Sequence, residues 1–362
     1  MILVDILLVI AALFVAFYNG ANDNFKGLAT VWGAETLSYR QALTLATVAT
    51  LAGCIASWLL ADTLVQQFSG RGLVPNEIAS APSFVLSVAV GAAFTVFLAT
   101  QLGFPISTTH ALIGALVGAG LGQANGEVHF AKLTQTFLLP LLISPLIAAS
   151  LGIAVYKLLR MRAIAQDCAC LVSAEPSPCI SENGAILRRI DVPQLVIADV
   201  AACKDISAQA RWSISRIMDQ LHVASALSIC FARGLNDTPK LAALLITAKA
   251  FERNHSVAII GIVMALGGLI SARKVAETMS HRINRMDPTQ GLAANLITAT
   301  LVIFASKIGM PVSTTHVSVG SIAGVGANAQ TLNWHALRNV LLSWVATLPL
   351  AAGTAWLAAK FV

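Results

Sequence analysis

The chain has 362 residues, of which 57% are hydrophobic and only 11% are charged, and its formal net charge is +6. A soluble protein of this length could not bury that much apolar side chain. The apolar stretches run for about 20 residues, which is the length that a helix needs to cross a bilayer. Few stretches alternate polar and apolar residues, which argues against a transmembrane β-barrel. The composition therefore predicts an all-α polytopic protein embedded in a lipid bilayer.

Ten hydrophobic segments follow one another along the chain, and we expect each to form a helix or half-helix. The first has no basic residues ahead of its apolar run and carries Asp5, which indicates a retained helix rather than a cleaved signal peptide. The ten segments cover approximately residues 2–33, 40–62, 82–103, 106–122, 133–158, 220–248, 256–272, 288–308, 311–327 and 334–360.

A polar linker over residues 160–219 separates a first membrane repeat, 1–159, from a second, 220–362. The apolar residues of 197–221 have helical spacing, which predicts a short helix at the membrane surface or in the cytoplasm. The spacing of the linker cysteines matches no standard zinc pattern, so we expect reduced thiols there. These cysteines are Cys168, Cys170, Cys179 and Cys203.

The basic residues are distributed unevenly between the two sides of the predicted membrane. With the N-terminus outside, 14 Lys and Arg residues fall in the connections on the linker side and five on the opposite side. Cytoplasmic connections of membrane proteins are enriched in these residues. The bias predicts a multi-pass cell-membrane protein with both termini outside and the linker in the cytoplasm. It also explains the net positive charge without a nucleic-acid partner.

One polar sequence interrupts the apolar pattern twice, as PISTTH at Pro105–His110 and as PVSTTH at Pro311–His316. Aligning residues 102–120 with 308–326 gives nine identities in 19 positions. Each half has five segments, so a linker that stays on one side forces the second half to insert upside down. The sequence therefore predicts two inverted-topology repeats with broken helices or re-entrant half-helices.

Each PxSTTH motif places hydroxyl side chains at the expected start of a half-helix. The proline ends the preceding helix, and a helix N-terminus offers free N–H groups and a partial positive charge. Such an end favours an anion. A proline-kinked helix whose hydroxyls bond its own backbone is the alternative. The residues concerned are Ser107, Thr108, Thr109, Ser313, Thr314 and Thr315.

An Asn-Asp pair precedes each motif, at Asn22-Asp23 and at Asn236-Asp237. An aspartate at bilayer depth costs roughly 2.5–3.5 kcal/mol on the insertion scale, so a functional role is the default. The pattern is typical of a cation site beside an anion, and sodium at Asp23 and Asp237 is one option. A structural ion pair with a lysine three residues on is the alternative.

His110 and His316 close the two motifs. A proton relay or a metal ligand is one interpretation of these histidines. A structural histidine bonded to a carbonyl is favoured, because no Cys or Glu stands at ligand spacing nearby. No bound metal or other cofactor is predicted.

These residues resemble the inorganic phosphate transporter (PiT, or PHO4) family, which carries a GANDVANA-like motif and a P-[IV]-S-T-T-H motif in each half. The resemblance covers nearly the whole chain outside the linker. It implies uptake of inorganic phosphate coupled to sodium or protons, with sulfate as a substrate in some relatives. It also implies that one site is lined by Asn22, Asp23, Ser107, Thr108, Thr109, Asn236, Asp237, Ser313, Thr314 and Thr315.

The chain departs from the family motif at its second Asn, where Lys26 stands in one half and Lys240 in the other. A lysine ammonium is a tethered cation that can take the space of a bound sodium or touch the anion directly. We therefore place both lysines in the substrate site. Lysines that extend to the membrane interface are the alternative.

The sequence thus predicts a symporter of inorganic phosphate that works by alternating access, with proton or sodium as the coupling ion. A permease for sulfate or another oxyanion and an anion channel are the alternatives. An enzyme is disfavoured, because adjacent residues on one helical turn do not converge as a catalytic triad must. Assembly as a homodimer is left open.

The orientation can be tested with single cysteines in a cysteine-free background. A cysteine in the 160–219 linker should resist an impermeant thiol reagent in intact cells and react after the cells are opened. A cysteine placed beside Arg71, on the predicted outer side, should react in intact cells. Labelling of the linker from outside would show that the predicted orientation is wrong.

Overall fold

The computed structural model describes residues 2–60, 62–123, 127–160, 168–172, 179–180, 186–187, 194–198, 208–247, 251–283 and 286–362. The chain divides into two units. The first combines Met1–Lys157 with His222–Val362, and the second is Leu158–Leu221. Both stretches that were predicted as membrane repeats therefore pack into one unit. The division of that unit into two repeats remains a prediction.

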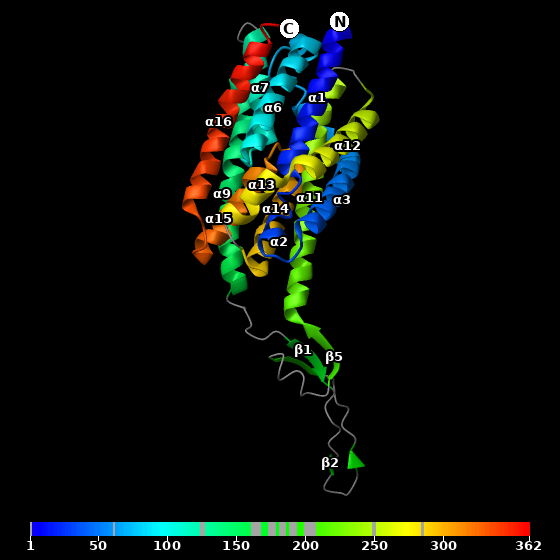
Figure 1. The fold of residues 1–362 in the computed structure, drawn as a ribbon, viewed down its shortest axis with the longest axis vertical. Coiled ribbons are helices and arrows are strands. Elements are labelled where there is room, and N and C mark those ends of the chain that lie inside the picture. The colour runs from blue at the N-terminus through cyan, green and yellow to red at the C-terminus, as the bar shows by residue number, and fades with distance from the viewer. Residues whose placement is uncertain are drawn as a thin grey trace. The chain divides into compact units, whose positions relative to one another are not determined.

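The first stretch of the membrane unit is helical from near its beginning. Its longest helices are α1, α3, α6 and α9, and they are joined by short helical pieces (Figure 1). The bounds are α1 Ile2–Asp23, α2 Ala29–Gly33, α3 Tyr39–Leu60, α4 Asp62–Gln67, α5 Asn76–Ala79, α6 Pro82–Leu102, α7 Thr108–Gln123, α8 Phe130–Lys132, the π-helix η1 Leu133–Leu138, and α9 Leu139–Arg160.

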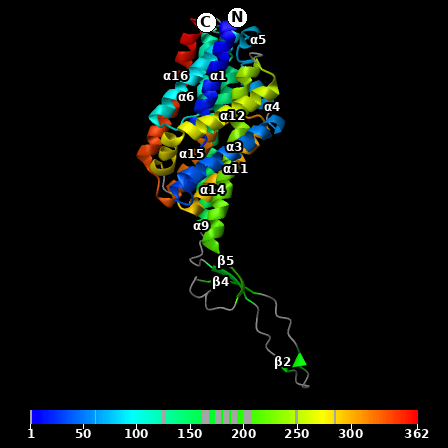
Figure 2. The same ribbon diagram turned by 45° about the vertical axis from the view of Figure 1, so that its right-hand side comes forward.

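The second stretch also consists of long helices joined by shorter helical pieces. Its C-terminus lies at the same end of the unit as the N-terminus (Figures 1 and 2). The helices α9 and α11 run toward the opposite end (Figure 1). The bounds are α11 Ile214–Thr247, α12 Arg253–Ser271, α13 Arg273–Glu277, the π-helix η2 Thr278–Arg282, α14 Pro288–Lys307, α15 Thr314–Ala329 and α16 Trp334–Ala358.

Seven stretches of the described helices are long and apolar enough to cross a membrane, which supports a multi-pass membrane protein. Three other helices carry the polar motifs. Helices α7 and α15 have 16 residues each, or about 24 Å at 1.5 Å per residue, which is less than the hydrocarbon thickness. Helix α11 has 34 residues but contains buried charged side chains. Helix α1, which ends in the Asn22-Asp23 pair, meets the criterion, whereas the two PxSTTH helices and the helix with Asn236-Asp237 do not.

The first predicted segment, 2–33, is wrong as one helix. Helix α1 ends at Asp23, and the chain turns before α2 begins at Ala29. Within the turn the backbone bonds tighten to three residues, from Lys26 N to the Asp23 carbonyl and from Leu28 N to the Phe25 carbonyl. The buried polar side chains of this turn bond to Thr47 of α3 and to the Ile106 carbonyl in front of α7, which replaces the regular helical pattern.

Glycines let the first helix of each half approach the second helix of the other half. Gly20 of α1 lies against the backbone of Met264 in α12, and Gly234 of α11 lies against that of Thr50 in α3. Aligning the two Asn-Asp pairs makes Gly20 equivalent to Gly234 and Thr50 equivalent to Met264. The same contact therefore occurs twice, each time between the two halves.

The half-helix of each motif also packs against a helix of the other half of the chain. Gly118 of α7 lies against the backbone of Ala352 in α16, and Gly324 of α15 lies against that of Ala149 in α9. Small residues at i and i+4 give close helix contact in membranes, as the GxxxG pattern predicts. Each half-helix is thus held by the last helix of the other half, which fixes its N-terminus at the centre of the unit.

The apolar surface of the membrane unit matches a lipid environment. Large aliphatic side chains are exposed along α9 and α16, including Leu146 at 67% and Val345 at 73%. The interior between α1, α6 and α7 is closely packed with small and aliphatic residues such as Ala12, Val88 and Ala115. Apolar residues on both the inside and the outside are what a bilayer-embedded bundle requires.

The Leu158–Leu221 unit contains short strands. They are β1 Cys168–Val172, β2 Cys179–Ile180, β3 Ile186–Leu187, β4 Gln194–Ala198 and β5 Ala208–Ser213. Strands β4, β1 and β5 form an antiparallel sheet in that order, with Ala169 opposite both Ile197 and Trp212. Strands β2 and β3 pair separately.

The helix predicted over 197–221 is therefore wrong for 197–198 and 208–213, which are strand, and right for 214–221, which begin α11. Residues 199–207 lie outside the described residues. The alternation of Ala210 and Trp212 with polar residues has a period of two, which favours a strand. Cys168 and Cys170 are each disulfide-bonded, though not to one another, since their Sγ atoms lie 3.5 Å apart, whereas the sequence led us to expect reduced thiols. Disulfides are rare in the cytosol, which gives the accessibility test of the linker additional weight.

The close glycine contacts predict a stability effect. Gly118→Leu should lower the free energy of unfolding by about 2 kcal/mol or more, because the side chain would overlap the α16 backbone. Thermal unfolding of the purified protein in detergent measures the change. Gly353→Leu is the matched control, because a Cβ at Gly353 meets no atom within 4 Å. Equal effects of the two variants would contradict close packing at Gly118.

Candidate functional site

The two PxSTTH motifs meet at the centre of the membrane unit. The Thr315 hydroxyl donates to the Ile106 carbonyl at 2.9 Å, and the Thr109 hydroxyl donates to the Val312 carbonyl at 3.5 Å. Thr109 is equivalent to Thr315 in the aligned motifs, and Ile106 is equivalent to Val312. Segments about 200 residues apart therefore form one reciprocal contact, and both motifs belong to a single site.

Serine side chains cap both half-helices. The Ser107 hydroxyl oxygen accepts the His110 N–H at 3.1 Å, and the Ser313 hydroxyl oxygen accepts the His316 N–H at 3.2 Å. A hydroxyl that accepts a capping bond still has its own hydrogen to donate. The Thr314 hydroxyl has no hydrogen-bond partner among the described residues. These hydroxyls lie where the helix N-termini favour negative charge.

Asn22 and Asn236 hold the broken backbone beside each motif. The Asn22 amide donates to the Thr100 hydroxyl at 3.1 Å and to the Phe104 carbonyl at 3.0 Å. In the other half, the Ser306 hydroxyl donates to the Asn236 oxygen at 3.1 Å, and the Asn236 amide donates to the Val312 carbonyl at 3.3 Å. These bonds satisfy backbone groups that have no helical partner, so the two asparagines hold the non-helical segment in front of each motif in place.

The two lysines cross between the halves. The Lys26 ammonium donates to the Ile106 carbonyl at 2.7 Å and to the Thr315 hydroxyl of the other motif at 2.6 Å. The Lys240 ammonium donates to the Val312 carbonyl at 2.9 Å and to the Thr109 hydroxyl at 2.8 Å. Both side chains are buried, at 4% and 1% exposure. The alternative that they extend to the membrane interface is wrong.

Both aspartates are surrounded by donors. One Asp23 oxygen accepts from the Lys26 ammonium, and the other accepts from the amide of Asn19 at 3.1 Å. Asp237 accepts from the Asn236 amide at 3.1 Å and lies 3.6 Å from the Lys240 ammonium. Each lysine ammonium therefore lies beside the carboxylate of its own half.

Thr108 joins the hydroxyl cluster to Asp23. Its hydroxyl accepts from the Asn19 amide at 2.9 Å and lies 3.4 Å from an Asp23 oxygen. The structure thus brings together all twelve residues that the sequence placed in the site. Whether they bind substrate remains a prediction.

Sequence reasoning missed two site residues, Asn19 and Arg233. The Arg233 guanidinium lies 3.6 Å from Asp237 and donates to the Asn19 side-chain oxygen at 2.9 Å. Both residues stand four positions before the aspartate of their half. One helical turn therefore places each above its carboxylate. That spacing was the signal that could have identified them.

The two motif histidines lie against each other, with ring centroids 4.3 Å apart. His316 also stacks on Trp344 and has a ring nitrogen 3.3 Å from the Leu141 carbonyl. That contact agrees with the favoured structural role. Among the described residues, no group of three or more His, Cys, Asp or Glu side chains could hold a metal ion.

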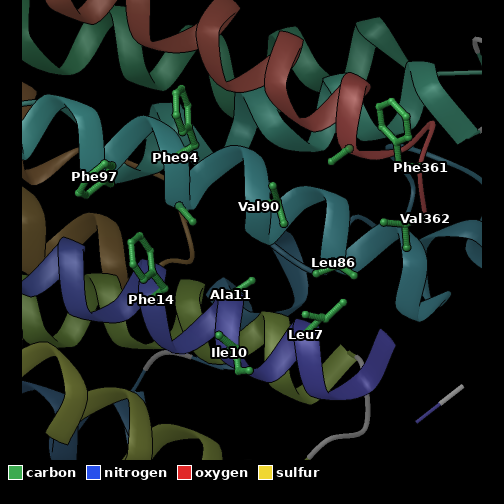
Figure 3. A pocket seen from close by; sticks show the side chains of 12 residues that line it. Leu7, Ile10, Ala11, Phe14, Leu86, Val90, Phe94, Phe97, Phe361 and Val362 are labelled. Atoms are coloured by element: carbon green, nitrogen blue, oxygen red, sulfur yellow. The ribbon is translucent and has the colours of Figure 1, made fainter. Parts of the chain in front are cut away.

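Two pockets outside the polar centre differ in character. A cavity of about 600 Å³ between α1, α6 and the chain end is lined by apolar side chains such as Leu7, Phe14 and Phe97 (Figure 3), which offer nothing to an anion. Another, of about 540 Å³, lies beside Phe104 and is lined by polar and basic side chains. Its polar lining residues are Thr278, His281, Arg282, Asn333, His335 and Asn339.

Comparison with known proteins identifies the family to which this architecture belongs. Residues 19–355 match the sequence profile of the phosphate transporter family, PHO4. The chain belongs to the phosphate transporter family. A protein of Thermococcus kodakarensis that is named as a phosphate permease is 28% identical over 378 residues, which cover 93% of this chain and 92% of that protein. A protein of Bacillus subtilis named as a low-affinity inorganic phosphate transporter is 26% identical and covers 97% of this chain, with 95% of its own length matched.

A solved structure described as a sodium-dependent phosphate transporter has the same fold, with a TM-score of 0.79 and 21% sequence identity. The match covers 99% of this chain and 98% of the other. The predicted family and the helical membrane fold are therefore confirmed. This member of the phosphate transporter family belongs among transporters and not among enzymes.

The capping geometry predicts which hydroxyls bind the anion. Alanine at Ser107 and Thr108, or at Ser313 and Thr314, should weaken phosphate binding by roughly 1–3 kcal/mol per lost donor. Binding of labelled phosphate to the purified protein measures this, and Thr44→Ala on the exposed face of α3 is the matched control. Unchanged affinity after substitution in both halves, in protein that still unfolds cooperatively, would refute a site made from both motifs.

Proposed function

We propose that this member of the phosphate transporter family is a secondary active symporter that carries inorganic phosphate across the cytoplasmic membrane by alternating access. One observation carries the proposal. Two capped half-helix N-termini carry hydroxyl clusters, and two buried ammonium groups bond across the halves to the hydroxyls of these clusters. Each of these features favours a bound anion, and their combination favours a tetrahedral oxyanion with several acceptors.

Hydrogen-bond geometry supports direct contact between the lysines and the substrate. Lys26 and Lys240 already lie within 2.8 Å of the Thr315 and Thr109 hydroxyls. An oxyanion at that point takes up ammonium and hydroxyl donors together, and charge-assisted bonds of this kind are the stronger ones. The predicted substrate site thus comprises the twelve predicted residues, with Asn22 and Asn236 holding its backbone.

The contacts of the carboxylates support proton rather than sodium coupling. Sodium would need several free carboxylate and carbonyl oxygens, but both Asp23 oxygens and the Ile106 and Val312 carbonyls already accept hydrogen bonds. Of the two carboxylates only one oxygen of Asp237 has no hydrogen-bond partner. A fixed ammonium supplies the neutralising charge that a mobile cation would otherwise bring. A proton can still travel with the phosphate or on a carboxylate.

The exchanged helix contacts support a rocking movement between the repeats. Every cross-half bond at the centre, such as Lys26 with Thr315, joins residues that would separate or slide as one repeat turns against the other. The polar pocket beside Phe104 offers an anion an approach, since Arg282 and two histidines line it and no acidic residue is among its described lining residues.

Uptake into proteoliposomes under separate proton and sodium gradients tests the function. We expect labelled phosphate to accumulate against its own gradient when a proton gradient is imposed. Equilibration without accumulation would indicate an anion channel, because a channel cannot concentrate its solute. Accumulation of sulfate in preference to phosphate would indicate a sulfate permease.

Wild-type uptake should persist when sodium is replaced by choline. Lys26→Asn with Lys240→Asn should lose this activity and regain part of it only when sodium is added, because the substitutions recreate the family's amide positions. Lysines that merely hold the halves together would give loss without rescue by sodium. Lys307→Asn, which removes an exposed lysine, is the control. Strict sodium dependence of the wild type would refute the tethered cations and leave the transporter assignment intact.

A further inference from the structure

The centre of the membrane unit holds an uneven set of charges. In the part of the chain that the structure describes, five Asp, Glu, Lys and Arg side chains are buried, and all five are at this site. They are Asp23, Lys26, Arg233, Asp237 and Lys240. Three are cations and two are carboxylates, so the site carries one positive charge more than it can compensate internally.

Arg233 is the member that breaks the twofold pattern. Lys26 matches Lys240 and Asp23 matches Asp237, but the position of Arg233 is taken in the first half by the neutral Asn19. The Asn19 amide donates to Asp23, whereas Arg233 faces Asp237 as an ion pair at 3.6 Å. The excess charge therefore comes from one identified residue.

The guanidinium is anchored on the first half of the chain but keeps donor capacity. Its terminal nitrogens donate to the side-chain oxygens of Asn24 at 3.3 Å and of Asn19 at 2.9 Å. Its Nε has no hydrogen-bond partner in the structure, and neither does the Asp237 oxygen that it faces. Arg233 is only 1% exposed. An unpaired donor and acceptor at this depth are costly unless a ligand or a rearrangement satisfies them.

We propose that Arg233 sets the charge of the anion that the site accepts, and that this charge is one. The inference rests on the proposed function of the same site. A monovalent oxyanion such as dihydrogen phosphate brings the buried charges to neutrality without a mobile cation. A divalent anion, either hydrogen phosphate or sulfate, leaves one negative charge uncompensated in a low-dielectric centre, which is unfavourable.

The pH dependence of binding distinguishes this role from a merely structural one. Between about pH 6 and about pH 8 phosphate loses its second proton while sulfate stays divalent. Wild-type affinity for total phosphate should fall as pH rises, in proportion to the monovalent fraction. The protein's own ionisable groups at the site are the two Asp–Lys pairs and the two motif histidines. Sulfate binding, measured over the same pH range, is the control for any change in their charge.

Two single variants at Arg233 and Asp237 and the corresponding double variant change the net charge of the site stepwise. Arg233→Gln removes the excess charge, so phosphate affinity at about pH 6 should fall by about tenfold or more. Asp237→Asn raises the excess to two, so sulfate should compete about tenfold better than in wild type, and the pH dependence should flatten. The double variant returns the excess to one and should recover the preference for the monovalent anion.

The measurement is displacement of labelled phosphate from the purified full-length protein by unlabelled phosphate and sulfate. Arg338→Gln, on the exposed face of α16, is the matched control and should leave the selectivity unchanged. Recovery of selectivity in the double variant is an outcome that simple misfolding of the single variants cannot produce. Thermal unfolding of each variant identifies any that do not fold.

Two results would overturn the inference. One is wild-type binding of sulfate as tight as that of phosphate across the pH range. The other is a folded Arg233→Gln variant with wild-type affinity and pH dependence. Either result would leave the proposed function standing, since phosphate would still bind. Failure of the folded wild type to bind phosphate at all would instead refute the proposed function.

Discussion

Charge compensation inside the membrane is the constraint on which this structure depends. Five buried ionisable side chains lie at one site, where an isolated charge would cost several kcal/mol. Each has a partner within about 4 Å, and two of the partnerships, Lys26 with Thr315 and Lys240 with Thr109, join opposite halves of the chain. The polar centre thus ties the halves together, while the glycine contacts bring their helices close enough for those side chains to reach.

The short half-helices raise a related problem, because their ends place polar backbone groups inside the membrane. A helix that ends in mid-membrane exposes backbone groups that lipid cannot satisfy. Here Ser107 and Ser313 cap the two helix starts, and Asn22 and Asn236 bond the irregular backbone in front of them. The features that make a site attractive to an anion are therefore also those that make a broken helix tolerable. Selection for function and the demand for hydrogen-bond satisfaction favour the same residues.

Much of this site could be predicted from the sequence, because its residues violate the rules of a membrane helix. A Pro-x-Ser-Thr-Thr-His insert and an aspartate in an apolar run are conspicuous, and their repetition identified the hydroxyl and Asn-Asp positions. Lys26 and Lys240 were added because the chain departs there from the family motif. The break at Asp23 was missed because the apolar pattern continues through Phe25 and Leu28 into α2. That pattern reports burial, whereas the turn is set by side chains that bond to distant helices.

Arg233 and the linker strands show the limit of local reasoning. The importance of Arg233 lies in its reach to Asn19, more than 200 residues earlier, which no pattern within one segment contains. In the linker, 197–221 has a plausible helical period, but β5 gains its hydrogen bonds by pairing with β1. Strand pairing is non-local, so the period of a short segment does not decide between the two structures.

The exchange of helix partners has a consequence for biosynthesis. Because Gly20 of α1 packs on α12 and Gly118 of α7 packs on α16, the first half emerges from the ribosome with its contact faces uncovered. The charged side chains of the first half are therefore in the bilayer before the second half is present. Lys26, three residues after Asp23 in the same segment of the nascent chain, can reach that carboxylate. The local pair neutralises the aspartate during insertion, before Arg233 has been translated.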